Sequence, residues 1–270
     1  MRTVAKRRFG QHFLRDTGVL DRIVRLIKPM PEDVFVEIGA GDGALSARLA
    51  GAVSRLIAVE VDVDLLQPLE AKLSRFPTAL VIQGDILKMN LAELVGEHLR
   101  PAGRLRIAGN LPYNIATAII RKLLYSSLPI ADMAFLLQLE VAHRIAASPG
   151  SREFGLLSLL TQHLSQVSIA FKVSPACFVP RPKVTSALVF LRPLFGSLDP
   201  CFEACFRELG QAAFGYRRKT IINALRRHAK LGADAARLLA EGGIDGSRRP
   251  EDLSVQEYEQ LARVRLRIEE

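Results

Sequence analysis

The feature that most constrains the fold is a regular alternation of short apolar runs with helical patterns over the first two thirds of the chain. The apolar runs predict strands at residues 34–38, 56–60, 79–83, 105–108 and 133–138, and helical patterns lie at 44–50 and 64–75. Strands that alternate with helices form a parallel sheet with helices on both faces. We therefore expect an α/β, Rossmann-like domain.

Two later runs differ from this pattern. Residues 166–173 and 187–192 are denser in β-branched and aromatic side chains, which are enriched in strands, and no long helix lies between them. A proline-rich link at 178–184 joins the two runs. We expect an antiparallel pair of strands that closes one edge of the sheet.

The sequence changes character after Pro193. Residues 194–200 have the composition of a linker, and the following residues are rich in Ala, Leu and Arg in helical patterns. A chain of 270 residues, 49% of them hydrophobic, can form one large domain with a small appendage. We expect residues 1–194 to form the α/β domain and residues 195–270 to form a small all-helical domain.

The charge balance indicates a polyanionic partner. Lys and Arg number 37 against 28 Asp and Glu, which gives a net charge of +9. Such an excess attracts nucleic acid first and acidic membrane surfaces second. Charge runs on helices are often only solvated faces, but in a basic protein phosphate contact is the favoured interpretation. The clustered cations that we expect to contact RNA are Arg7, Arg8, Arg217, Arg218, Lys219, Arg226 and Arg227.

The sequence has no run of 18 apolar residues and no N-terminal signal segment. Its three cysteines, Cys177, Cys201 and Cys205, cannot all pair with one another and lack the surroundings of a zinc site. We therefore expect a cytoplasmic protein with reduced thiols, no membrane association and no metal.

A glycine-rich turn between the first predicted strand and its helix indicates a nucleotide-like ligand. In EIGAGDGA (37–44), Gly39 and Gly41 let the backbone turn tightly and approach a ligand closely. The second strand ends at Glu60, which can hold a ribose hydroxyl pair, and the third ends beside Asp85, near the expected adenine. This spacing favours an adenosine cofactor and does not separate NAD from S-adenosylmethionine.

The fourth strand ends in Asn110, Leu111, Pro112 and Tyr113, at the edge where α/β sheets bind ligands. The Asn110 side-chain oxygen and a backbone carbonyl of the turn can accept hydrogen bonds from the exocyclic amine of adenine. Such bonds localise a nitrogen lone pair that the ring otherwise delocalises. Pro112 fixes the turn, and Tyr113 offers a face on which an extruded base can stack. The pattern favours methyl transfer from a sulfonium, with no metal and no covalent intermediate.

Five segments together resemble the KsgA/RsmA family of ribosomal RNA adenine dimethyltransferases over nearly the whole chain. They are RFGQHFL (8–14), EIGAGDG (37–43), NLPY (110–113), FVPRPKV (178–184) and FGYRRKT (214–220). The resemblance implies a class I methyltransferase domain followed by a small helical domain. The implied cofactor is S-adenosylmethionine, which is released as S-adenosylhomocysteine.

The resemblance also implies roles for individual residues. The residues that it assigns to the cofactor are His12, Leu14, Gly39, Gly41, Glu60, Asp85 and Asn110, and the catalytic set is Asn110, Leu111, Pro112, Tyr113 and Phe178. Tyr113 and Phe178 are expected to sandwich the target base. The family commonly has Asn where this chain has His12. A side-chain contact there would change the cofactor affinity, whereas a backbone contact would not.

The substrate that the resemblance implies is a pair of adjacent adenosines in the 3′-terminal hairpin loop of 16S rRNA, each methylated twice on the amine during late small-subunit assembly. One rival is a resistance methyltransferase that modifies large-subunit RNA, and residues 214–220 favour the small subunit over it. A second rival is a non-catalytic assembly factor, against which the intact glycine turn and NLPY motif argue. A third, an NAD-dependent dehydrogenase, lacks an evident acid–base pair. We expect a monomer, because no apolar stripe predicts self-association.

Overall fold

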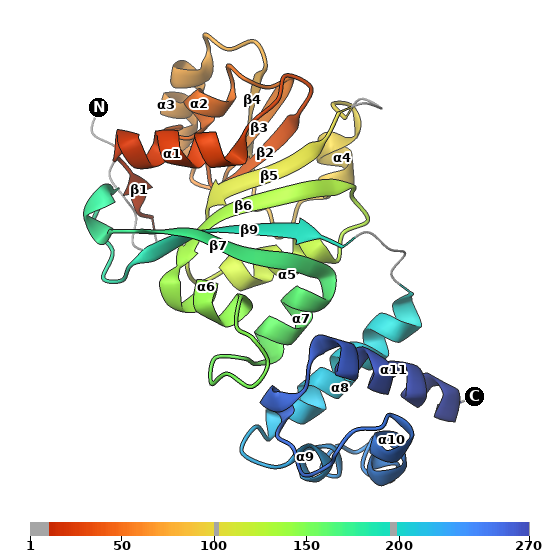
Figure 1. Cartoon of the computed structure of the whole chain (residues 1–270). Coiled ribbons are helices and arrows are strands. Elements are labelled where there is room, and N and C mark those ends of the chain that lie inside the picture. Colours follow the sequence, from red (N-terminus) through yellow and green to blue (C-terminus); the bar gives the residue numbers. More distant parts are fainter. Residues whose placement is uncertain (1–10, 100–102, 195–198, 270) are drawn as a thin grey trace. The chain divides into compact units, whose positions relative to one another are not determined.

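Figure 1 shows the computed structural model of the protein, which describes residues 11–99, 103–194 and 199–269. The chain divides into two compact units. Unit 1 comprises Met1–Ala142 and Gln166–Pro193, and unit 2 comprises His143–Ser165 and Leu194–Glu270. The two-domain division near residue 195 stays a prediction, and unit 2 also takes in residues 143–165, which precede that boundary in the sequence.

Unit 1 is built on a seven-stranded sheet in the order β4-β3-β2-β5-β6-β9-β7. Its strands are β2 (Val34–Ile38), β3 (Arg55–Glu60), β4 (Ala79–Gln83), β5 (Leu105–Asn110), β6 (Ile130–Gln138), β7 (Ser165–Val173) and β9 (Ser186–Pro193). The first five pair in parallel, and β9 runs antiparallel to β6. The α/β, Rossmann-like class and the five predicted parallel strands are confirmed, and β7 and β9 lie together at one edge as expected.

Helices cover both faces of this sheet. Those of unit 1 are α1 (Thr17–Ile27), α2 (Ser46–Leu49), α3 (Val63–Leu73), α4 (Leu91–Gly96) and α5 (Ala116–Leu124), and α6 (Leu139–Ile145) continues into unit 2. Figure 1 shows α1 and α5 on opposite sides of the sheet. Consecutive strand residues point to opposite faces, and all five residues of β2 are buried, so both of its faces are covered. Four of the five are apolar, and the fifth is Glu37.

Helix α1 was not predicted from the sequence, and it anchors the start of the described chain to the sheet. Its first turn is capped by Asp16, whose side chain accepts a hydrogen bond from the Val19 N–H at 2.9 Å. Its apolar stripe of Leu20, Ile23 and Ile27 packs in one core cluster with Phe35 and Leu56 of the sheet. The helix therefore holds the residues just before it against unit 1.

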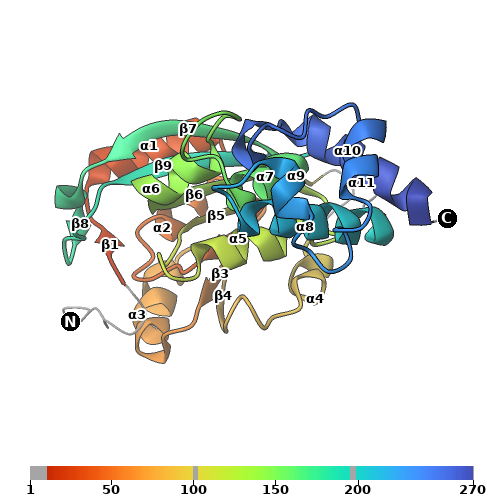
Figure 2. The same ribbon diagram turned by 90° about the horizontal axis from the view of Figure 1, so that it is seen from below.

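A second, two-stranded sheet pairs distant parts of the chain. Strand β1 (Phe13–Leu14) lies antiparallel to β8 (Phe178–Val179), with Phe13 opposite Val179 and Leu14 opposite Phe178. The strands lie side by side in Figure 2, and a 3-10 turn (Pro175–Cys177) precedes β8. This pairing brings the residues around His12 next to the proline-rich link.

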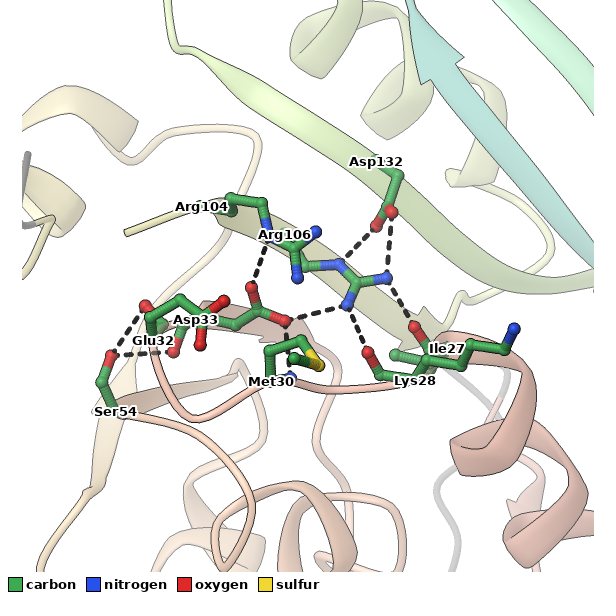
Figure 3. Close-up of polar contacts among 9 residues, drawn as sticks. All are labelled: Ile27, Lys28, Met30, Glu32, Asp33, Ser54, Arg104, Arg106 and Asp132. Atoms are coloured by element: carbon green, nitrogen blue, oxygen red, sulfur yellow. Dashed lines mark hydrogen bonds and ion pairs between the residues drawn. The ribbon is translucent and has the colours of Figure 1, made fainter. Parts of the chain in front are cut away.

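A buried ionic network ties α1 to the sheet at the ends of β2 and β5 opposite the glycine turn (Figure 3). Arg106 bonds both oxygens of Asp132, at 2.8 and 2.9 Å, and Asp33 Oδ2 at 2.9 Å. It also donates to the last carbonyls of α1, those of Ile27 at 2.7 Å and Lys28 at 3.1 Å. Carbonyls at a helix end lack partners within the helix, so Arg106 acts as a side-chain cap.

Unit 2 is helical in its described residues. Its helices are α7 (Leu156–Leu164), α8 (Pro200–Gly215), α9 (Ile221–Leu225), α10 (Ala235–Glu241) and α11 (Val255–Glu269), with a 3-10 turn at Pro250–Asp252. Residues Phe206 of α8 and Tyr258 of α11 are fully buried in its core, and the Tyr258 hydroxyl donates to the Pro250 carbonyl at 3.0 Å. No helix in the described part of the chain is long and apolar enough to cross a membrane.

An ionic cluster joins three of these helices. His163 on α7 lies between Glu203 on α8 and Glu259 on α11. Its Nε2 lies 2.8 Å from a Glu203 carboxylate oxygen, and its Nδ1 lies 2.8 Å from a Glu259 carboxylate oxygen. Its ring also stacks on Phe206, 4.0 Å between centroids. Burial lowers the pKa of His163, but the two hydrogen bonds and charges of the carboxylates outweigh burial and raise the pKa above its ordinary value.

Candidate functional site

A pocket opens at the carboxyl ends of β2, β3 and β5 in unit 1. Residues of four segments line it, and they are Gln11, His12, Phe13, Gly39, Ala40, Gly41, Glu60, Val61, Asn110, Leu111, Pro112 and Tyr113. The carboxyl ends of neighbouring parallel strands meet at one edge of a sheet, so segments far apart in sequence converge there. The space in this pocket is about 610 Å³ with the open solvent at its mouth included.

The glycine turn after β2 has the backbone that the sequence predicted. Gly39 and Gly41 have φ values of +70° and +59°, the left-handed region that favours glycine. A Cβ on Gly41 would lie 3.1 Å from the Phe13 ring. The turn therefore needs glycine for its conformation and for the close approach of β1.

Two carboxylates underlie this turn. Glu60 accepts hydrogen bonds from the N–H groups of Gly41, Val61 and Asp62 at 2.8, 2.9 and 2.8 Å. Burial raises its pKa, although these bonds oppose the rise. A carboxylate offers about four acceptor positions, so three N–H bonds leave room for one hydroxyl donor. Glu37 on β2 is fully buried, and burial raises its pKa to about 8, with smaller contributions from Asp42 and Glu60.

The orientation of the Asn110 amide is fixed by the segment before β1. Its Nδ2 donates to the backbone carbonyl of His12 at 2.7 Å. A carbonyl only accepts, so the nitrogen of the amide must face His12 and the oxygen Oδ1 faces away from it. The following turn is ordered as well, because the Pro112 carbonyl accepts from Ile115 and Ala116 at the start of α5.

Tyr113 is held on two sides. Its hydroxyl shares a hydrogen bond of 2.9 Å with Ser186 Oγ, and its ring stacks on His12 with 5.6 Å between centroids. Burial raises the pKa of Tyr113, with the Ser186 bond acting in the opposite direction. The residue is therefore a neutral phenol at pH 7, with an aromatic ring at the pocket wall.

The structure gathers most of the predicted site residues in one place. The pocket lining includes His12, Gly39, Gly41, Glu60, Asn110, Leu111, Pro112 and Tyr113. Three predicted residues lie outside that lining. Leu14 and Phe178 are buried register partners in the small sheet, and Asp85 follows β4 and accepts from the Leu87 N–H at 3.0 Å. Their contacts with cofactor or target base stay predictions.

Four residues of the lining were not predicted from the sequence, and they are Gln11, Phe13, Ala40 and Val61. Ala40 lies between the two glycines already chosen, and Val61 directly follows Glu60, so proximity in sequence was the available signal. Gln11 and Phe13 depend on the β1–β8 pairing, since Gln11 bonds Asp62 at 3.0 Å and Phe13 abuts Gly41. No local pattern predicts these contacts.

The predicted RNA-binding cations of unit 2 surround the turn from α8 to α9. Arg218, Lys219, Arg226 and Arg227 are exposed, and the Arg227 guanidinium lies 5.2 Å from the ring centroid of the half-exposed Tyr216. Arg217 is half-buried instead, where it bonds the Arg152 carbonyl and pairs with Glu251 at 3.6 Å. Arg7 and Arg8 lie outside the described residues. RNA contact by all seven stays a prediction.

Comparison with known proteins identifies the family. Residues 2–265 match the family described as ribosomal RNA adenine dimethylase. A protein of Chromohalobacter salexigens named ribosomal RNA small subunit methyltransferase A is 44% identical over 96% of this chain and 90% of its own length. A protein of the same name from Pediococcus pentosaceus is 38% identical over 95% of this chain and 88% of its own length.

Solved structures confirm the class I methyltransferase fold. A dimethyladenosine transferase from Plasmodium falciparum has a TM-score of 0.77 at 22% identity, covering 93% of this chain and 96% of that one. The 23S rRNA methyltransferase ErmE has a TM-score of 0.70 at 24% identity, covering 93% of this chain and 98% of that one. The family match over nearly the whole sequence agrees with the resemblance seen in its motifs, and the chain belongs to the ribosomal RNA adenine dimethylase family, whose members are rRNA adenine dimethyltransferases.

Proposed function

We propose that the protein transfers methyl groups from S-adenosylmethionine to the exocyclic amines of two adjacent adenosines in the 3′-terminal hairpin loop of 16S rRNA. Each adenosine receives two methyl groups, and the reaction takes place during late assembly of the small subunit. The observation that carries this proposal is the orientation of Asn110. Its amide nitrogen is bound by the His12 carbonyl, so its oxygen is the atom left to accept from a substrate amine.

The pocket fits an adenosine cofactor. The glycine turn gives a ligand access to backbone between Gly39 and Gly41, where a side chain at Gly41 would crowd Phe13. Glu60 retains one acceptor position for a ribose hydroxyl, and Val61 beside it offers an apolar surface to a base. Leu14 and Asp85 lie outside the lining, and their contact with the cofactor is proposed from the family resemblance alone.

When bound, the cofactor supplies a methyl group on a positively charged sulfur. Asn110 Oδ1 and a carbonyl of the Leu111–Pro112 turn accept from the two protons of the target amine. These bonds hold the nitrogen near tetrahedral geometry and localise its lone pair for attack on the methyl carbon. With the cofactor bound, the S–C bond would break as the N–C bond forms, the positive charge would pass from sulfur to nitrogen, and the methylated amine would then lose one proton to water. Positioning of the two reactants supplies most of the rate enhancement.

Tyr113 contributes a stacking surface for an extruded base. The bond to Ser186 fixes its ring, and a neutral phenol stacks without bringing a charge into the pocket. Phe178 is proposed as the opposite wall of the base. It is 2% exposed, so this role requires a rearrangement of the β1–β8 sheet when RNA binds.

The choice of the small subunit rests on the names of the relatives and on unit 2. The curated relatives at 38–44% identity are named for the small subunit, whereas the large-subunit enzyme ErmE matches at 24%. The exposed cations at the α8–α9 turn are proposed to bind rRNA phosphates. We propose that the enzyme acts as a monomer.

The test is methyl transfer from labelled S-adenosylmethionine to undermethylated small subunits, large subunits and free RNA, followed by nucleoside analysis. We expect dimethyladenosine only with small subunits. Label in large-subunit RNA would instead identify a resistance-type enzyme. Tight binding to small subunits with no label anywhere would identify an assembly factor and refute the proposed reaction.

A further inference from the structure

Lys122 on α5 bonds the backbone of a distant segment. Its Nζ donates to the carbonyls of Leu87 at 2.9 Å and of Met89 at 2.6 Å, in the turn that follows β4. The side chain is half-buried, and within the part of the chain that the structure describes it forms no ion pair. Two of the three donors of this lysine are therefore used to tie α5 to that turn.

The turn that Lys122 holds carries Asp85 at its start. The Asp85 carbonyl accepts from the N–H groups of Lys88 at 2.8 Å and Met89 at 3.1 Å, and its Oδ1 accepts from the Leu87 N–H at 3.0 Å. These bonds use the N–H groups of the turn, whereas Lys122 uses two of its carbonyls. Among the described residues no donor lies within hydrogen-bond distance of Asp85 Oδ2, so this oxygen is available to a ligand.

Asp85 follows β4 at the point where this strand meets the wall of the pocket. Gln83 is the register partner of Glu60, which lines the pocket, and the Gly84 N–H donates to the Glu60 carbonyl at 2.9 Å. A Cβ on Gly84 would lie 2.7 Å from Met89 Sδ, so the turn folds back against the residue before Asp85. This strand end is the place that the sequence predicts for the adenine of the cofactor.

Helix α5 also begins at the turn that is proposed to hold the target amine. The Pro112 carbonyl accepts from the N–H groups of Ile115 and Ala116, where the helix starts. Lys122 lies six residues beyond Ala116, which is about 9 Å along a helix. One rigid element therefore attaches to both turns.

We infer that Lys122 is a positioning residue for the adenine of the cofactor and acts through the turn at residues 85–89. It holds Asp85 where Oδ2 accepts from the exocyclic amine of that adenine, and α5 fixes this turn relative to the one at 110–113. The inference rests on the proposed function. It deepens that function by giving adenine specificity to a residue outside the pocket lining.

The test compares the binding of S-adenosylhomocysteine with that of S-inosylhomocysteine, in which a carbonyl oxygen replaces the amine of the adenine. Calorimetric titration of the full chain gives both Kd values, and their ratio measures recognition of the amine. A general loss of structure changes both Kd values alike and leaves the ratio unchanged. Thermal denaturation checks the folding of every variant.

Two variants of Lys122 carry the test. Lys122→Met removes all three donors, and Lys122→Gln is a milder change that keeps an amide donor on a shorter side chain. Lys88→Met is the matched control, because Lys88 is an exposed lysine of the same turn and its side chain bonds no other described residue.

We expect the wild type to bind S-adenosylhomocysteine more tightly than S-inosylhomocysteine. Lys122→Met should raise the Kd for S-adenosylhomocysteine about 2- to 13-fold, the range of one net hydrogen bond, and leave the Kd for S-inosylhomocysteine nearly unchanged. Lys122→Gln should lie between Lys122→Met and the wild type, and Lys88→Met should match the wild type. In an Asp85→Ala background, which lacks the acceptor, Lys122→Met should not change the ratio further.

Three results would overturn the inference and leave the proposed function intact. They are a wild type that binds the two ligands equally, Lys122 variants that keep the wild-type ratio and Kd values, and Lys122 variants in which both Kd values rise by the same factor. Lys122→Gln decides between these outcomes if Lys122→Met does not fold. A wild type that does not bind S-adenosylhomocysteine would overturn the proposed function, and this inference with it.

Discussion

Replacement of Arg106 by Met should destabilise unit 1 severely. The guanidinium makes five hydrogen bonds, to two carboxylates and two carbonyls, and its side chain is only 6% exposed. Met has a similar length and no donors. Asp33, which is 0% exposed, would keep only Arg104 and the Met30 N–H, and Asp132 would lose the guanidinium. The last carbonyls of α1 would lose their cap.

Breaking a buried ion pair by removing one partner costs about 3–5 kcal/mol, because the remaining charge stays buried. The matched control is Arg104→Met. Arg104 bonds the same Asp33 carboxylate at 2.9 Å, but its side chain is 49% exposed. A pair with one partner in solvent contributes about 0–1 kcal/mol. Each variant thus removes one positive charge beside Asp33, from residues two positions apart in the chain. The two arginine side chains differ chiefly in burial.

Urea denaturation followed by circular dichroism gives the free energy of unfolding, and amide hydrogen exchange assigns the loss to unit 1. We expect Arg106→Met to lower the melting temperature by about 6–20 °C, at about 2–4 °C per kcal/mol. Faster exchange should centre on α1 and β5 and spare α8 and α11. Equal effects of Arg106→Met and Arg104→Met would refute the reasoning, since burial would then not decide the cost.

Three further predictions concern pH and the site. Glu37→Gln should change the stability of the protein little at pH 5 and raise it at pH 8.5. The pKa of Glu37 is about 8 in the folded protein and 4.5 when unfolded, so the wild type loses stability as pH rises from 4.5 to 8, whereas Gln cannot ionise. Melting temperatures at both pH values test this, with the exposed Glu32→Gln as control. His163→Gln should lower the melting temperature more at pH 6 than at pH 9. The raised pKa of His163 means that its protonated form stabilises the fold below pH 6.5, and this contribution is lost as pH rises through the pKa of the folded protein. An equal decrease at both pH values counts against this prediction. Asn110→Asp should lower the ratio of dimethyl to monomethyl product, because a carboxylate charge enclosed against a methylated amine is unfavourable. An unchanged ratio contradicts the role given to the neutral amide.

The parts of the fold that the sequence predicted are those that local pattern determines. Strands β2 and β4 match their predicted residues because each is a short apolar run bounded by turn residues. The pocket followed from these strands, since residues at their carboxyl ends share an edge. Helix α1 was not predicted, although Asp16 and the apolar stripe of Leu20, Ile23 and Ile27 are a capping and periodicity signal that local reasoning could have used.

What could not be predicted depends on pairing between distant residues. Strand β1 has two residues and pairs with β8 more than 160 positions away, so no periodicity marks it. The burial of Phe178, the approach of Phe13 to Gly41 and the orientation of Asn110 by His12 all depend on that pairing. Expected roles for Leu14 and Phe178 came from family resemblance, which supplies identities and not surroundings.

Strand β5 carries both of the features that matter most, at opposite ends. Arg106 closes the ionic network near its start, and Asn110, four residues later, faces the pocket, a separation of about 13 Å along an extended strand. Changes that adjust the resistance of the protein to heat can therefore accumulate at one end without altering the reacting groups at the other. A lineage adapting to a hotter or colder habitat could retune the ends of α1, β2 and β5 around Arg106 and keep its rRNA target unchanged.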